Sequence, residues 1–158
     1  MSNDTAMDTA KKAPQKSPRH RARELAMQGI YQWRVTGGDV AQIEKQIHAE
    51  KNIGRYDKEL FSRLLRGALA KHADIEALIS RHLDRPIIEL SPVEFAVLLL
   101  GTFELSQSPE VPYKVVINEA VELAKTFGGT DGHKYVNGVL DKLAPQLRAP
   151  EFAGRGKV

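Results

Sequence analysis

Basic residues gather near the start of the chain, in a pattern suited to binding phosphate groups. Six lysines or arginines and no acidic residue lie between Lys11 and Arg23. The run ends in PRHRARELAMQGIYQW, where apolar residues begin to recur with a helical period. Cations at the start of a helix oppose its dipole, so helix stability alone does not favour them there. We therefore expect a basic arm that contacts nucleic-acid phosphates, and the alternative is a solubilising tail.

The other reactive side chains form no catalytic or metal-binding pattern. The chain has no cysteine, which excludes thiolate chemistry and disulfides and fits a reducing compartment. Its five histidines show no HExxH-like spacing, and the sequence has no GxxxxGK[ST] or GxGxxG motif. The glycine-rich segment 128–132 lacks a preceding strand and the lysine that a phosphate loop needs. We predict no catalytic residue, no metal and no cofactor, which leaves a binding protein.

The elements that must position the basic residues are helices. With 158 residues and 42% apolar composition, the chain suits one domain with tails. The stretch from Ser91 to Ser106, SPVEFAVLLLGTFELS, is the predicted centre. Ser91 and Glu94 form a capping-box pattern, and the apolar run that follows must be covered on most sides. This run is shorter than the ~20 apolar residues needed to span a bilayer.

Amphipathic segments on both sides of this stretch complete an all-α prediction of about seven helices. No segment is predicted as a strand with confidence. Residues 1–18 are expected to form a disordered basic extension, because they show no apolar period. Residues 19–147 are expected to form the all-α domain, and residues 148–158 a flexible tail.

The first predicted helix has one apolar face and one polar face. The apolar face contains Ala22, Leu25, Ala26, Gly29, Ile30 and Trp33. The arginines at 19, 21 and 23 are expected to lie off this face. Met27 and Tyr31 are expected on the polar side, either as an edge contact with another helix or as a protein contact surface.

Three stretches together resemble the family of the transcription antitermination factor NusB. They are RHRARELAMQGIYQW, ELSPVEFAVLLLGTFEL and VPYKVVINEAVELAKTFGGTDGHKYVNGVLDKLAP. The resemblance covers about Arg19 to Pro145, and the third stretch is the most specific. It implies an all-α fold of two small packed helical bundles. It also implies binding of boxA RNA together with NusE, a small-subunit ribosomal protein. The pair joins an RNA polymerase antitermination complex on ribosomal RNA operons.

The resemblance also assigns candidate residues. The RNA-binding candidates are Arg19, His20, Arg21 and Arg23 at the start of the first helix, with Asp131, His133 and Lys134 before the last one. The candidates for the NusE-facing surface are Tyr31, Glu94 and Tyr135. Each has a purely structural alternative: Glu94 completes a capping box, Asp131 can be an N-cap, and Tyr135 can cover the edge of the core.

The chain departs from the family pattern in the central stretch and near its end. Phe95 and Leu99 stand where basic residues are expected, and Tyr135 replaces a usual phenylalanine. We expect these changes to make that surface more apolar, which leaves a homodimer as an open alternative.

Two other functional classes compete with an antitermination factor. A similar helical domain precedes RNA cytosine methyltransferases, but little sequence follows Pro145, so we expect no catalytic domain. The other alternative is a non-catalytic helical adaptor that binds only protein partners. The start of the sequence has no apolar run, so we expect no signal peptide and no membrane anchor, and therefore a cytoplasmic protein.

Overall fold

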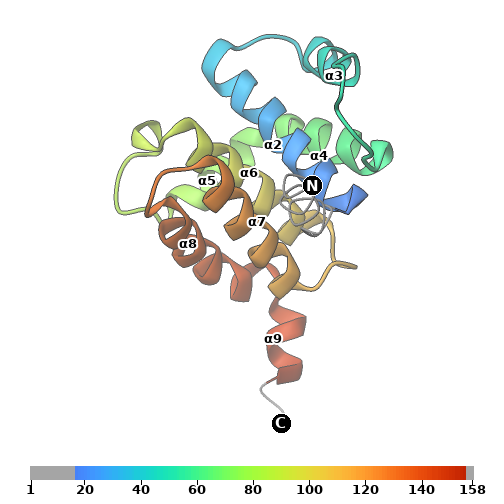
Figure 1. The fold of residues 1–158 in the computed structure, drawn as a ribbon. Helices are drawn as coiled ribbons and strands as arrows, with labels where there is room; N and C mark the ends of the chain where they lie inside the picture. Colours follow the sequence, from blue (N-terminus) through green and yellow to red (C-terminus); the bar gives the residue numbers. More distant parts are fainter. Residues whose placement is uncertain (1–16, 156–158) are drawn as a thin grey trace, which may run out of the picture.

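The computed structural model describes residues 17–155, and within that range the chain folds into α-helices without a β-strand (Figure 1). In chain order the elements are α2 (Pro18–Thr36), α3 (Val40–His48), α4 (Lys58–Ala70), α5 (His72–Ser80), the 3₁₀ helix η1 (Ile87–Glu89), α6 (Pro92–Gln107), α7 (Tyr113–Phe127), α8 (Gly132–Leu147) and α9 (Ala149–Arg155). The all-α prediction is confirmed, with eight α-helices in the described range where about seven were expected.

Side-chain caps begin several of these helices, and one of them is the predicted capping box of Ser91 and Glu94. The side chain of Asp39 accepts a hydrogen bond from the backbone N–H of Gln42, and that of Asp57 accepts one from Leu60. Ser91 and Glu94 form both bonds of the capping box at the start of α6. Because side-chain oxygens satisfy the free N–H groups of a first turn, these starts are readable in the sequence.

Helix α2 begins earlier than the predicted domain boundary. Ser17 accepts a hydrogen bond from the backbone N–H of His20, and Pro18 occupies the first helical position. These two residues therefore belong to the folded part rather than to the predicted extension. The rest of that extension, residues 1–16, lies outside the described residues.

Helix α6 is the centre of the fold, as predicted. Every residue from Phe95 to Leu105 is buried. The helix contacts α2, α4, α5, α7 and α8. Helices α2, α3 and α4 thus form one small bundle, α5 to α8 form a second, and α6 joins their cores into one apolar cluster. Each large side chain buried in that cluster contributes ~1.5–3 kcal/mol of transfer free energy.

The segment between α5 and α6 is not one continuous helix. Helix α5 ends at Ser80, and η1 begins only after Pro86. Helical backbone is disfavoured at Arg85 because a proline follows it, which keeps the two elements apart.

The segment after α8, predicted to be a flexible tail, contains a further helix, α9, that packs on the domain. Arg148, expected to start a flexible tail, is buried and donates hydrogen bonds to the backbone carbonyls of Glu104, Leu105 and Ser108. The Leu105 carbonyl has no helical donor, because residue 109 is a proline, and Arg148 supplies one; the carbonyls of Glu104 and Ser108 also accept backbone N–H groups of Ser108 and Val111. In α9 the ring of Phe152 packs on Tyr113, with 4.6 Å between ring centroids. No helix within residues 17–155 is long and apolar enough to cross a membrane.

Candidate nucleic-acid interface

The first turns of α2 hold the basic residues predicted to meet RNA, but most of these residues are already paired. Arg19 is the most open: its side chain is 51% exposed and lies 3.8 Å from a carboxylate oxygen of Asp57. His20 Nδ1 lies 2.8 Å from Glu119 Oε1 on α7. Arg21 donates hydrogen bonds to the Ile53 carbonyl and to Glu24. The start of α2 is therefore less cationic toward solvent than its sequence indicates.

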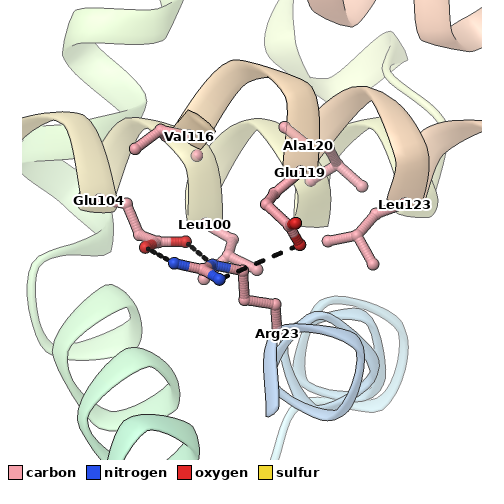
Figure 2. A pocket seen from close by; sticks show the side chains of 9 residues that line it. Arg23, Leu100, Glu104, Val116, Glu119, Ala120 and Leu123 are labelled. Carbon is pink, nitrogen blue, oxygen red and sulfur yellow. Dashed lines mark hydrogen bonds and ion pairs between the residues drawn. The ribbon is translucent and has the colours of Figure 1, made fainter. Parts of the chain in front are cut away.

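Arg23 does not lie on the polar face, so this part of the prediction is wrong. Its side chain is 5% exposed and points from α2 into the junction with α6 and α7 (Figure 2). There its guanidinium donates two hydrogen bonds to Glu104, at 2.7 and 3.0 Å, and lies 4.0 Å from Glu119. The periodicity of α2 could not reveal this, because both partners come from helices about 80 or more residues later.

Arg23 takes part in a structural ion pair, and its surroundings do not form a ligand site. Its recess, lined by apolar residues of α6 and α7 such as Leu100 and Val116, has no room even for water. Burial alone would lower the pKa of Arg23, but the hydrogen bonds and charge of Glu104, with the charge of Glu119, raise it. The guanidinium therefore stays charged, and a buried charge of this kind depends on its partner.

The middle of α2 carries one exposed aromatic residue. Tyr31 is 41% exposed, as predicted, whereas Met27 is buried, so the expectation for Met27 on the polar side is wrong. A surface hollow of about 260 Å³ lies between the two residues and the neighbouring helices, lined also by Gln28, Val93 and Phe127. The hollow joins α2 to the first turn of α6 and the last turn of α7. An exposed aromatic beside an apolar hollow is typical of a protein contact surface.

The start of α8 is open to solvent. The side chains of Asp131 and Lys134 are 79% and 74% exposed and form only a loose ion pair with each other, at 3.7 Å. Asp131 occupies the N-cap position of α8, as predicted, but its side chain makes no cap hydrogen bond. His133 lies in the same turn and is half-buried. Glu94 adjoins this turn, since a Cβ built on Gly132 would lie 3.4 Å from its Oε2.

Tyr135 ties α8 to the segment that precedes α6. Its hydroxyl donates a hydrogen bond to Asp84 Oδ1 at 2.9 Å, and the guanidinium of Arg85 lies over its ring at 4.3 Å. Burial raises the pKa of the Tyr135 hydroxyl, while hydrogen bonds from Arg85 and Tyr135 lower the pKa of Asp84. A phenylalanine here could not make the bonds to Asp84, so the departure from the family pattern adds an interaction.

The two apolar departures in the central helix do not reach the surface. Phe95 and Leu99 are both fully buried. Arg34 of α2 covers the Phe95 ring at 4.2 Å, and Trp33 stacks beside it at 6.5 Å. The predicted apolar surface at these positions is therefore wrong, and with it the reason for expecting a homodimer there.

Two acidic residues were missed by the sequence reasoning. Glu104 stands within the apolar sequence of α6, and a lone acid in a buried helix requires a cationic partner. The position of Glu104 in the sequence therefore indicated a buried cationic partner. Glu119 on α7 gave no such signal, since it lies on an ordinary amphipathic face. Within residues 17–155 no group of histidine and acidic side chains is arranged to hold a metal ion.

The predicted residues thus fall into two groups rather than one. Arg19, His20 and Arg21 surround the start of α2. Glu94, the turn 131–134 and Tyr135 surround the start of α8. Tyr31 belongs to neither group and lines the hollow together with Val93, the residue before Glu94. Arg23 belongs to neither exposed group.

Comparison with known proteins gives consistent matches over most of the chain. The model of the NusB family matches residues 20–145. A transcription antitermination protein NusB from Ralstonia nicotianae is 55% identical over 144 residues, covering 91% of this chain and 93% of the relative. One from Nitrosospira multiformis is 57% identical over 133 residues, 84% of each chain.

Solved structures match in the same way. The structure of T. maritima NusB superposes with a TM-score of 0.75 at 33% identity, covering 88% of this chain and 99% of that one. A chain from a crystal structure of antitermination factors NusB and NusE in complex with dsRNA gives 0.74 at 30% identity, covering 80% and 96%.

Proposed function

The chain belongs to the NusB family, and we propose that it is an RNA-binding transcription antitermination factor that acts with NusE. In this proposal the pair binds boxA RNA and joins an RNA polymerase antitermination complex that supports transcription of ribosomal RNA operons. The observation that carries the proposal is the likeness over most of the chain to NusB proteins, including a chain solved with NusE and dsRNA.

In this proposal, residues of both exposed groups bind RNA. Arg19, His20 and Arg21 at the start of α2, with His133 and Lys134 at the start of α8, meet the RNA backbone. The described cations in these groups are few, so the phosphate contacts they make are few as well. Asp131 lies at the same edge and accepts hydrogen bonds from RNA base or sugar groups.

NusE is proposed to meet the surface between these groups. Tyr31 and the apolar hollow beside it offer an aromatic anchor next to a concave wall, which is the usual form of a binding hot spot. Glu94 and Tyr135 lie at the far end of that surface. Glu94 keeps its capping role and presents a carboxylate to a cation of the partner.

The proposal involves no catalysis and places the protein in the cytoplasm, where RNA polymerase works. The support for a non-enzymatic role is membership in a family of transcription factors. The buried acidic and basic side chains of α2, α6 and α7 form ion pairs with one another, as Arg23 and Glu104 do.

One observation favours the alternative, a helical adaptor that binds only proteins. Arg21 and Arg23 are held by carboxylates, so their charges are partly neutralised before any RNA arrives, and His20 is already bonded to Glu119. An adaptor needs only the hollow beside Tyr31.

Binding of the purified full chain to a boxA-like RNA and to a scrambled control, with and without NusE, decides between the two. The antitermination proposal expects preference for the boxA-like RNA and tighter binding with NusE. Binding of NusE without any RNA binding would establish the adaptor instead.

A further inference from the structure

Gly138, in the interior of α8, has no packing reason to be glycine. By contrast, Gly29, Gly67 and Gly101, in the interiors of α2, α4 and α6, each meet another helix. A Cβ on Gly29 would lie 2.7 Å from Leu65, one on Gly101 would lie 3.2 Å from Leu140, and one on Gly67 would overlap the ring of Phe103. A Cβ on Gly138 would meet nothing within 4 Å.

The backbone of Gly138 does not need glycine either. Positive φ angles occur at Gly37, Gly38 and Gly54 within the described glycines, and Gly138 is not among them. Glycine in an exposed helix interior destabilises the helix relative to alanine, because it loses more backbone freedom on folding. A position that bears this cost without a fold-related reason is typical of a place where another molecule approaches the backbone closely.

A hollow lies at this position. It has a volume of about 170 Å³, and Tyr135, Gly138 and Val139 of α8 are among the residues that line it. Lys134 and Lys142 flank it on the same helix, and His82 and Asp84 close it from the segment after α5. The two lysines are four residues before and four residues after Gly138, so all three lie on one face, with the lysines about 12 Å apart along the helix axis.

The charges around the hollow favour an anion. Both lysine side chains are exposed. Lys134 is held only by a loose surface pair with Asp131, which contributes little and exchanges easily. The one carboxylate that lines the hollow, Asp84, already accepts hydrogen bonds from Arg85 and Tyr135. The uncompensated charge of the hollow is therefore positive.

We propose that this hollow is a backbone subsite for RNA, in which a phosphodiester group of single-stranded RNA lies against Gly138 between Lys134 and Lys142. The inference rests on the proposed function and extends it: the RNA path continues from the start of α8 along the helix toward the segment after α5. Gly138 admits the backbone because it carries no side chain, and the lysines neutralise the phosphates on either side. As a phosphate contact, the subsite contributes affinity without base preference.

The test compares three single variants of the full chain with the wild type, using a boxA-like RNA and NusE. Gly138→Ala adds one methyl group to the lining of the hollow. It should raise the melting temperature by about 2–4 °C, as alanine favours the helix. It should weaken RNA binding roughly three- to tenfold. A residue with only a structural role would not move stability and affinity in opposite directions.

Lys142→Gln removes one flanking charge. It should weaken RNA binding and flatten the slope of log affinity against log salt by about 0.7, for boxA-like and scrambled RNA alike. Lys45→Gln is the matched control, since Lys45 is an exposed lysine on α3, on the opposite side of the molecule from α8 (Figure 1). It should leave the slope unchanged.

The outcomes separate this inference from the proposed function. If the wild type binds RNA and Gly138→Ala and Lys142→Gln bind it as tightly, the subsite is overturned and the proposed function stands. If Gly138→Ala instead weakens binding of NusE in the absence of RNA, the hollow is a protein contact and the RNA assignment is overturned. If the wild type binds no RNA with or without NusE, both proposals fail.

Discussion

Helices α2 and α8 both begin with cationic residues that the sequence marks for RNA, yet the two starts are built differently. At the start of α2, Arg23 is buried against Glu104, and His20 and Arg21 are held by carboxylates and a carbonyl. At the start of α8, Lys134 and Asp131 are mostly exposed and only loosely paired. Cationic residues thus form ion pairs within the protein at the start of α2, whereas at the start of α8 they remain available to bind another molecule.

The difference teaches that charge near a helix start does not by itself identify a binding residue. An arginine that meets two carboxylates in a recess without room for water has lost its hydration and cannot exchange partners at low cost. A lysine on the surface keeps its hydration, and when it binds a phosphate it displaces counterions from the nucleic acid. Burial by neighbouring helices decides which of the two a given cation becomes.

The largest expected effect comes from separating the partners of the buried pair. Arg23→Gln should lower the free energy of unfolding by about 3–5 kcal/mol, because Glu104 is left buried without its cation. Urea denaturation followed by circular dichroism measures the loss. The double variant Arg23→Met with Glu104→Leu should recover most of it, since an apolar pair needs no charge compensation. A loss below about 1 kcal/mol for the single variant would show that water reaches the pair.

A second prediction concerns Glu94, which serves the fold and borders the open start of α8. Glu94→Gln should change the free energy of unfolding by less than about 0.5 kcal/mol, because glutamine also closes a capping box. If the carboxylate meets a cation of NusE, the same variant should bind NusE roughly five- to tenfold more weakly. Isothermal titration calorimetry with NusE measures this. Equal affinity would assign Glu94 to capping alone.

The contrast between the two helix starts also predicts different salt dependences of RNA binding. Lys134→Gln should flatten the slope of log affinity against log salt by about 0.7, the share of one phosphate contact to a single strand. The Arg23→Met and Glu104→Leu double variant should keep the wild-type slope, because Arg23 touches no phosphate. A salt titration of both folded variants tests this. A flatter slope in the double variant would place Arg23 in the RNA site after all.

The smallest effect is expected where Tyr135 holds Asp84. Hydrogen bonds from Arg85 and Tyr135 lower the pKa of Asp84 in the folded protein, so its contribution to stability is present above the unfolded-state pKa and is lost as pH falls through the folded-state pKa. Tyr135→Phe should move the pKa of Asp84 up toward its ordinary value and shrink this pH-dependent part. An NMR titration of the Asp84 carboxyl measures the shift. An unchanged pKa would leave Arg85 as the sole cause.

Sequence alone determined the fold class, the central helix and most helix starts. Hydrophobic periodicity and capping side chains act over three or four residues, so Ser91 and Glu94 could be read without knowing the rest of the chain. The lone acid Glu104 in an apolar helix was equally visible, although its meaning depended on finding the partner. Predictions from local patterns of this kind hold in the folded protein, because the interactions they rest on form between residues of the same helix or of adjacent turns.

Only the tertiary structure decided which residues of these helices face solvent. Arg23 reads as one of three alternate arginines, and its burial arises from α6 and α7, which come about 80 residues or more later. Phe95 and Leu99 were expected to form an apolar surface, but both are buried, and Arg34 and Trp33 of α2 pack on Phe95. Arg148 was expected to start a tail, but in the structure it donates a hydrogen bond to the Leu105 carbonyl near the end of α6. In each case the partner is far away in sequence, and long-range packing leaves no trace in local periodicity.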